Sequence, residues 1–123
     1  MTENKVLIID DDQDVRQAMT DLLKIEGFSA ASAANGLEGL ERMRSEDHIS
    51  MVLLDLWMPQ MDGWEFLRQK GRDARIADVP VVVLSSIPPV SLDGAETILR
   101  KPVDTEPLLQ ILRRHCRGET TAQ

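Results

Sequence analysis

Three short apolar runs, rich in β-branched residues, constrain the fold of this 123-residue chain more than any other feature. They span Lys5–Ile9 (KVLII), Met51–Leu54 (MVLL) and Val79–Leu84 (VPVVVL). Each run is almost continuously apolar rather than alternating, which is typical of strands buried on both faces of a parallel sheet. Weaker strand candidates lie at Phe28–Ala33 and Glu96–Arg100, so we predict five strands.

Helical patterns fill most of the intervals between these runs. Apolar residues recur at helical spacing in four segments: about 12 to 26, 37 to 43, 64 to 67 and 108 to 112. The alternation of strands and helices predicts right-handed crossovers and a doubly wound α/β sandwich.

One interval departs from this rhythm. Residues 86–95, which separate the last two predicted strands, contain Pro88, Pro89 and Gly94. Proline in a helix interior costs about 3 kcal/mol. We therefore expect a loop, or at most one helical turn, in place of the fourth crossover helix.

Composition excludes several classes of protein. With 14 basic and 21 acidic residues, the net charge of −7 argues against direct binding to nucleic acid or to an anionic membrane surface. The single cysteine, Cys116, excludes an internal disulfide framework. No apolar run approaches the roughly 20 residues that span a bilayer. We expect one cytoplasmic domain over residues 1–117 and a flexible tail at 118–123.

Polar residues follow the predicted strands where each strand ends. Asp10 and Asp11 follow the first strand, Asp55 the third, Ser85 the fourth and Lys101 the fifth. In an open α/β sheet, ligands bind beyond the carboxyl ends of the strands. We therefore expect three acids, a hydroxyl and an amine to converge at one edge of the sheet.

Such a cluster indicates phosphoryl chemistry. Neighbouring carboxylates repel one another unless a proton or a cation joins them, and Mg²⁺ prefers oxygen ligands of this kind. A lysine and a hydroxyl beside the metal could hold an anion, and the whole would form an electrostatic clamp for a transferring phosphoryl group. A carboxylate in that clamp is a credible nucleophile that forms an acyl phosphate.

These residues also carry a family resemblance. The strings IIDDD at 8–12, LLDLWMPQMDG at 53–63, LSS at 84–86 and KP at 101–102 resemble the receiver domain of two-component response regulators. The resemblance covers the chain from Lys5 to about Arg117. It implies a flavodoxin-like sheet with the strand order 2-1-3-4-5.

The resemblance also implies roles for the acids. Asp55 is similar to the phospho-acceptor, and Asp10 and Asp11 to the acid pair that holds Mg²⁺, with Asp11 as the direct ligand. Asp55 and the backbone carbonyl of Trp57 would complete the metal site, in which Mn²⁺ could substitute. The phosphoryl donor would be a phosphohistidine of a histidine kinase or a histidine phosphotransfer domain. The domain would catalyse only its own phosphorylation and dephosphorylation and is not otherwise an enzyme.

Four further positions match the resemblance. Ser85 stands at the family's switch Ser/Thr position, and Lys101 at its lysine position. Pro102 resembles the proline that follows this lysine, often with a cis peptide bond. Ser86 is expected to be small because it lies beside the phosphoryl site.

Other positions depart from the family pattern. Ile98 occupies the place of the aromatic residue that turns inward on activation, and the loop at 86–95 replaces a helix of the usual output face. We expect the signal to be read through residues 86–95 and the last helix by an unidentified downstream protein, with the chain a monomer or weak dimer. The apolar Trp57 and Ile87 flank the site, and we expect them to slow hydrolysis by hindering water.

Two alternative interpretations remain open from the sequence. Asp10-x-Asp12-x-Asp14-Val15 is similar to the opening motif of haloacid dehalogenase-type phosphatases, although no later acid pair follows. The same acids resemble half of a calcium-binding loop, but Val15 stands where that loop needs glycine and Asp21 where it usually has glutamate.

Overall fold

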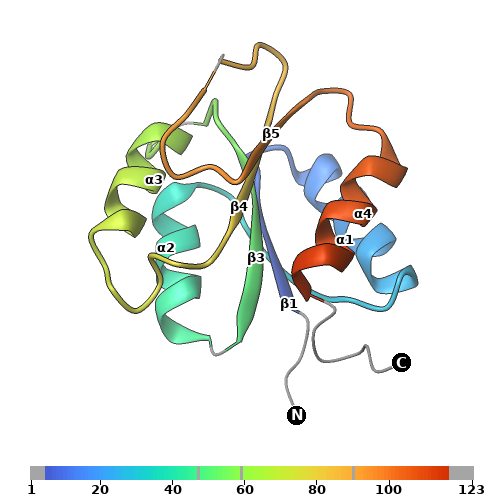
Figure 1. Cartoon of the computed structure of the whole chain (residues 1–123), viewed down its shortest axis with the longest axis horizontal. Coiled ribbons are helices and arrows are strands. Elements are labelled where there is room, and N and C mark those ends of the chain that lie inside the picture. The colour runs from blue at the N-terminus through green and yellow to red at the C-terminus, as the bar shows by residue number, and fades with distance from the viewer. Residues whose placement is uncertain (1–4, 47, 59, 90, 117–123) are drawn as a thin grey trace.

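The structure is a computed structural model that describes residues 5–46, 48–58, 60–89 and 91–116 (Figure 1). Its elements in chain order are β1 (Lys5–Ile9), α1 (Gln13–Ile25), β2 (Ser29–Ala33), α2 (Gly36–Ser45), β3 (Ile49–Asp55), α3 (Gly63–Gly71), β4 (Val81–Ser85), β5 (Thr97–Arg100) and α4 (Thr105–Cys116). The tail expected at 118–123 lies outside the described residues. No helix in the described part of the chain is both long and apolar enough to cross a bilayer.

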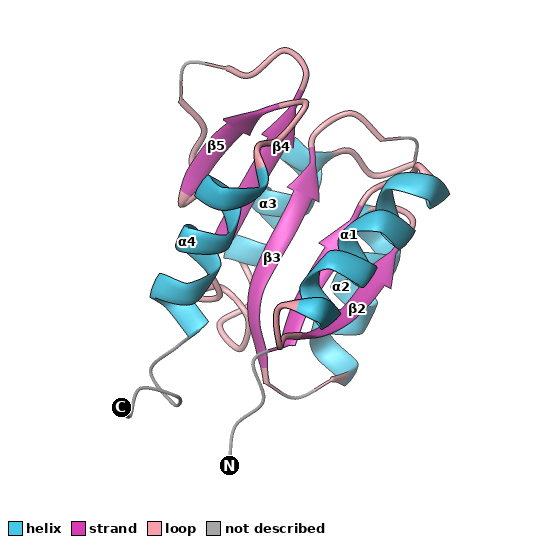
Figure 2. Cartoon of the chain, turned by 90° about the vertical axis from the view of Figure 1, so that its right-hand side faces the viewer, coloured by secondary structure: helices cyan, strands magenta, loops and turns pink. Residues whose placement is uncertain are grey.

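The five strands form one parallel sheet in the order β2-β1-β3-β4-β5. Helices α2 and α3 cover one face of the sheet, and α1 and α4 cover the other (Figure 1). The strands all point the same way, so the loops after β1, β3 and β4 gather at one edge (Figure 2). The predicted doubly wound fold and strand order are confirmed.

Alternating strand side chains fill two separate cores. In β3, Val52 and Leu54 join the core under α2 and α3, whereas Met51 and Leu53 join the core under α1 and α4. All four side chains are fully buried. Because both faces are covered, the strands must be apolar at every position, which explains the continuous runs in the sequence.

The connection from β4 to β5 is a loop, as predicted. Among the described residues between 86 and 96 there is no helix. Leu92 and Ala95 pack against the core under α2 and α3, and Ile98 of β5 packs against the same core. The strand predicted from Val79 begins instead at Val81, because Pro80 has no N–H to donate to the sheet.

Gly63 brings the start of α3 against the backbone that follows Asp55. Asp62 is the N-cap of α3, and the Gly63 N–H donates to the Leu56 carbonyl at 2.9 Å. A Cβ atom at position 63 would lie 2.8 Å from Leu56 Cα and 3.2 Å from the Asp55 carbonyl oxygen. A side chain at this position therefore has no room unless the main chain beside Asp55 moves.

We expect Gly63→Ala to destabilise the fold by about 1–3 kcal/mol, the usual cost of overpacking, and to shift the backbone of Asp55 and Leu56. Urea unfolding and backbone amide NMR measure the two effects. Gly71→Ala is the matched control, because a Cβ at position 71 meets nothing within 4 Å. Equal destabilisation by both substitutions would contradict the steric explanation.

Candidate functional site

Three carboxylates meet where β1 and β3 end. One carboxylate oxygen from each of Asp10, Asp11 and Asp55 lies within 4.8 Å of the others. Asp10 and Asp55 are buried, with 3% and 7% of their surface exposed, whereas Asp11 is exposed. The parallel pairing of Ile9 with Leu54 places the ends of these two strands side by side. The structure therefore brings together the acids that the sequence placed at one edge.

The Lys101 amine lies between two of these acids. Its Nζ is 3.2 Å from Asp10 Oδ2 and 3.5 Å from Asp55 Oδ1. The Lys101 backbone N–H donates to the Ser85 carbonyl at 3.0 Å, which holds the end of β5 beside the end of β4. The peptide bond between Lys101 and Pro102 is cis, as the resemblance implied.

Asp10 is held by hydrogen bonds at each of its polar groups. Its N–H donates to the Ala33 carbonyl at 3.1 Å, and its Oδ1 accepts from the Asp12 N–H at 2.9 Å. Its Oδ2 accepts from Lys101, and its backbone carbonyl accepts from Arg16 at 2.8 Å. Among the described residues, by contrast, no hydrogen bond holds the Asp11 carboxylate. Asp11 is therefore the acid most available to a cation.

Burial raises the pKa of Asp55 above its ordinary value of 3.8. Desolvation is the largest cause, and the negative charges of Asp10 and Asp11 act in the same direction. The Lys101 ammonium and the backbone N–H of Trp57, which donates to Asp55 Oδ1 at 3.4 Å, lower the pKa but do not cancel the rise. Three carboxylates share one ammonium in the metal-free site, and a bound cation would offset the repulsion among them.

Ser85 is fully buried at the end of β4, next in sequence to Leu84, which is paired with Asp55 across the sheet. Its Oγ accepts a hydrogen bond from the Ile87 N–H at 3.2 Å. An accepting hydroxyl keeps its own proton for donation to another group. Ser86 is exposed, and Ile87 is 74% exposed.

Two tryptophans lie beside the site on the α3 side. Trp57 is 58% exposed, and its ring meets that of Trp64 edge to face, with centroids 4.9 Å apart and an interplanar angle of 73°. Trp64 belongs to the first turn of α3. This contact is not predictable from sequence, because side chains seven residues apart across a loop have no fixed geometry.

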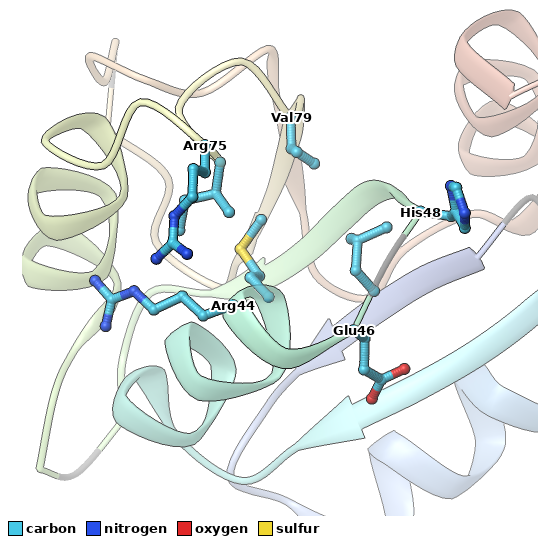
Figure 3. Close-up of a pocket in the computed structure, with 8 residues that line it drawn as sticks. Arg44, Glu46, His48, Arg75 and Val79 are labelled. Carbon is cyan, nitrogen blue, oxygen red and sulfur yellow. The ribbon is translucent and has the colours of Figure 1, made fainter.

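A hollow of about 280 Å³ lies near the start of β3 (Figure 3). Arg44 and Arg75 lie at one end of it, and Glu46 and His48 at the other. Both arginines contact Asp73, and their hydrogen bonds lower the pKa of that carboxyl to about 2. The charges of Arg44 and Arg75 are therefore already paired with that of Asp73. The lining of the hollow includes none of the predicted site residues.

The structure argues against both alternative interpretations. Asp12 is the N-cap of α1, and its carboxylate accepts from the N–H groups of Asp14 and Val15. It is therefore engaged with the backbone rather than available as the second acid of a phosphatase. Asp14 lies inside α1, where the chain is helical and cannot form the calcium-binding loop.

Comparisons with known proteins agree with the fold and show the family. The model of the response regulator receiver domain family matches residues 6–113. The two-component response regulator ORR5 of Oryza sativa subsp. japonica is 32% identical over 115 residues, which cover 89% of this chain and 86% of that protein.

Solved structures share the fold. The chemotaxis protein CheY4 of Vibrio cholerae has a TM-score of 0.81 at 28% identity, covering 94% of this chain and 99% of that one. The response regulator TrrA of Thermotoga maritima, solved in complex with Mg²⁺–BeF, shares the fold with a TM-score of 0.80 at 23% identity, covering 93% and 98%.

The fold and the acid–lysine site together define a signalling module of the two-component class. The chain belongs to the response regulator receiver domain family.

The raised pKa of Asp55 predicts how stability depends on pH. Because the folded-state pKa lies above the unfolded value, the contribution of Asp55 is fully present below pH 3.8 and is lost as the pH rises through the folded-state pKa. We therefore expect Asp55→Asn to raise the free energy of unfolding of the metal-free protein at pH 7, and the gain to disappear near pH 4.

Urea unfolding in EDTA between pH 4 and 8 measures this difference. A control series is run at pH 7 with saturating Mg²⁺. Mg²⁺ at 100 times its Kd should raise the free energy of unfolding of the wild type by about 2.7 kcal/mol, and that of Asp55→Asn much less. If Asp55→Asn is less stable than the wild type at pH 7 without metal, the Asp55 carboxylate does not destabilise the fold, which would contradict a raised pKa for Asp55.

Proposed function

We propose that this receiver domain accepts a phosphoryl group on Asp55, from a phosphohistidine of a histidine kinase or a histidine phosphotransfer domain, in a Mg²⁺-dependent reaction. The single observation that carries the proposal is the position of the Lys101 amine, 3.5 Å from Asp55 and 3.2 Å from Asp10. A fixed ammonium beside a buried carboxylate is useful to a reaction that brings an anion to that carboxylate.

The residues at the site fit Mg²⁺. Hard oxygen ligands from one or two carboxylates, completed by waters, are what Mg²⁺ prefers, and three carboxylates lie within reach of one another. Asp11 and Asp55 would bind the ion directly, together with the Trp57 carbonyl, and Mn²⁺ would substitute. Asp10, whose two oxygens already accept hydrogen bonds, would act through a water. The binding of Mg²⁺–BeF by TrrA supports this choice of metal.

Asp55, Lys101 and Ser85 would have different roles in the transfer of the phosphoryl group. An Asp55 oxygen attacks phosphorus while the bond from phosphorus to the donor's imidazole nitrogen breaks, which leaves an acyl phosphate and imidazole. The Lys101 ammonium and the Ser85 hydroxyl would each contact a phosphoryl oxygen. The metal, when bound, supplies further positive charge to the phosphoryl group. Water later hydrolyses the acyl phosphate, so the domain acts on itself rather than on a separate substrate.

Phosphorylation would then shift an equilibrium between two conformations. Ile98 stands where the family resemblance places the switch aromatic. In the structure Ile98 packs against the core under α2 and α3, as do Leu92 and Ala95 of the β4–β5 loop. That loop, rather than a fourth crossover helix, follows the Ser85 hydroxyl directly. We propose that residues 86–95, together with α4, present the signal to a downstream protein, with the domain a monomer or weak dimer and without direct contact to nucleic acid.

The first test is phosphorylation itself. With Mg²⁺ and acetyl phosphate or phosphoramidate, we expect the intact mass to rise by one phosphoryl group, and Asp55→Asn or EDTA to abolish the gain. Lys101→Met should lower the rate by about 100-fold or more, in the range for loss of one charge-stabilising group.

Asp62→Asn is the matched control for this test. Asp62 caps α3, and Asn caps a helix as well as Asp does, so this variant should still be phosphorylated. Phosphorylation of Asp55→Asn at the wild-type rate would rule out Asp55 as the acceptor.

The second test concerns the lifetime of the phosphoryl group. Trp57 and Ile87 are exposed apolar side chains two residues after Asp55 and Ser85, where they would hinder the attacking water. We expect the variants Trp57→Asn and Ile87→Glu to lose phosphate several-fold faster, as followed by intact mass. Ile25→Glu, which changes an exposed apolar residue on α1, should not alter the rate; an unchanged lifetime in the first two variants would argue against this role.

The third test concerns the output surface. Backbone amide shifts should be compared in the presence of Mg²⁺ with and without beryllium fluoride. We expect changes at the described residues of 86–95 and at α4 beyond those around Asp55. Shifts confined to the acid cluster would refute output through this surface.

A further inference from the structure

Arg16 lies in the first turns of α1, and its side chain turns back towards the end of β1. Its Nη1 donates a hydrogen bond of 2.8 Å to the backbone carbonyl of Asp10. The side chain is partly buried rather than extended into solvent. Nothing in the sequence patterns described above assigned a role to this residue.

The carbonyl that Arg16 holds belongs to the peptide that joins Asp10 to Asp11. The N–H and the carboxylate of Asp10 are fixed by Ala33, Asp12 and Lys101. The Asp11 carboxylate, by contrast, has no hydrogen bond among the described residues, so the backbone on either side of Asp11 sets where its side chain starts. The Asp12 N–H holds the peptide after Asp11, and Arg16 holds the peptide before it. A rotation of the peptide would carry the Asp11 oxygen away from the 4.8 Å cluster.

We propose that Arg16 is a positioning residue for divalent cation binding: by holding the Asp10 carbonyl, it directs the Asp11 carboxylate towards the other two acids. This inference rests on the Mg²⁺ site proposed above and adds a residue that does not itself touch the ion. The role is that of a supporting hydrogen bond behind a metal ligand, an arrangement known to tune metal affinity.

The charge of Arg16 acts in the opposite direction to its hydrogen bond. A guanidinium near the acids repels Mg²⁺, so removing the charge alone would tighten metal binding. Removing a hydrogen bond that supports a ligand typically weakens binding by about 10–100-fold. The sign of the change in affinity therefore separates a positioning role from a purely electrostatic one.

The experiment is a Mg²⁺ titration at constant ionic strength of the wild type, Arg16→Met and Arg16→Lys. Tryptophan fluorescence is the readout, because Trp57 lies two residues after Asp55 and its backbone N–H donates to Asp55 Oδ1. Met removes both donor and charge, whereas Lys keeps both. We expect Arg16→Met to bind Mg²⁺ about tenfold more weakly or worse, and Arg16→Lys to stay within about threefold of the wild type.

Two controls accompany the titration. Arg113→Met removes a positive charge from α4 at its contact with Glu26 and should leave the Mg²⁺ affinity unchanged. Circular dichroism checks that each variant folds, and amide NMR of the metal-free protein should show that Arg16→Met shifts Asp11 and Asp12 whereas Arg113→Met does not.

The proposal is overturned if Arg16→Met binds Mg²⁺ as tightly as the wild type or more tightly. It is also overturned if Arg16→Lys is as weak as Arg16→Met, because a donor at this position would then not restore binding. A wild-type protein that binds no Mg²⁺ would remove the proposed metal site and this inference together, and the wild-type titration alone reveals that outcome.

Discussion

The contact of the Lys101 amine with Asp10 and Asp55 is the interaction on which the account of the site depends. It joins the end of β5 to the ends of β1 and β3, three strands that are far apart in the sequence. Its single positive charge faces three carboxylates, and the pKa of Asp55 stays raised despite it. The site thus carries a surplus of negative charge that costs stability and favours the binding of a cation.

The rest of the fold serves to hold these groups in place. Two apolar cores, one on each face of the sheet, fix the strands whose ends carry the acids and the amine. At Gly63, the lack of a side chain lets α3 begin directly against the residue that follows Asp55. Asp10 and Asp55 are therefore buried close together because the strands that carry them pair side by side, although their charges repel.

Much of this arrangement was predictable from sequence, since continuous apolar runs indicate buried parallel strands and the polar residues after them must share one edge. The loop at 86–95 was also predictable, because Pro88 and Pro89 cannot lie inside a helix. The hydrogen bond from Arg16 and the contact of Trp57 with Trp64 were not. A basic residue in the first turns of a helix is usually solvated, and only the structure shows that the side chain of Arg16 turns back to a carbonyl.

A crystal structure of the protein with Mg²⁺ and beryllium fluoride tests the central claim most directly. We expect the beryllium atom to be bonded to an Asp55 oxygen, with a fluorine in contact with the amine of Lys101, and the metal to lie between Asp11 and Asp55. Beryllium fluoride bonded through beryllium to a different acid, or a Lys101 amine that turns away from its fluorines, would contradict the assignment of Asp55 and Lys101.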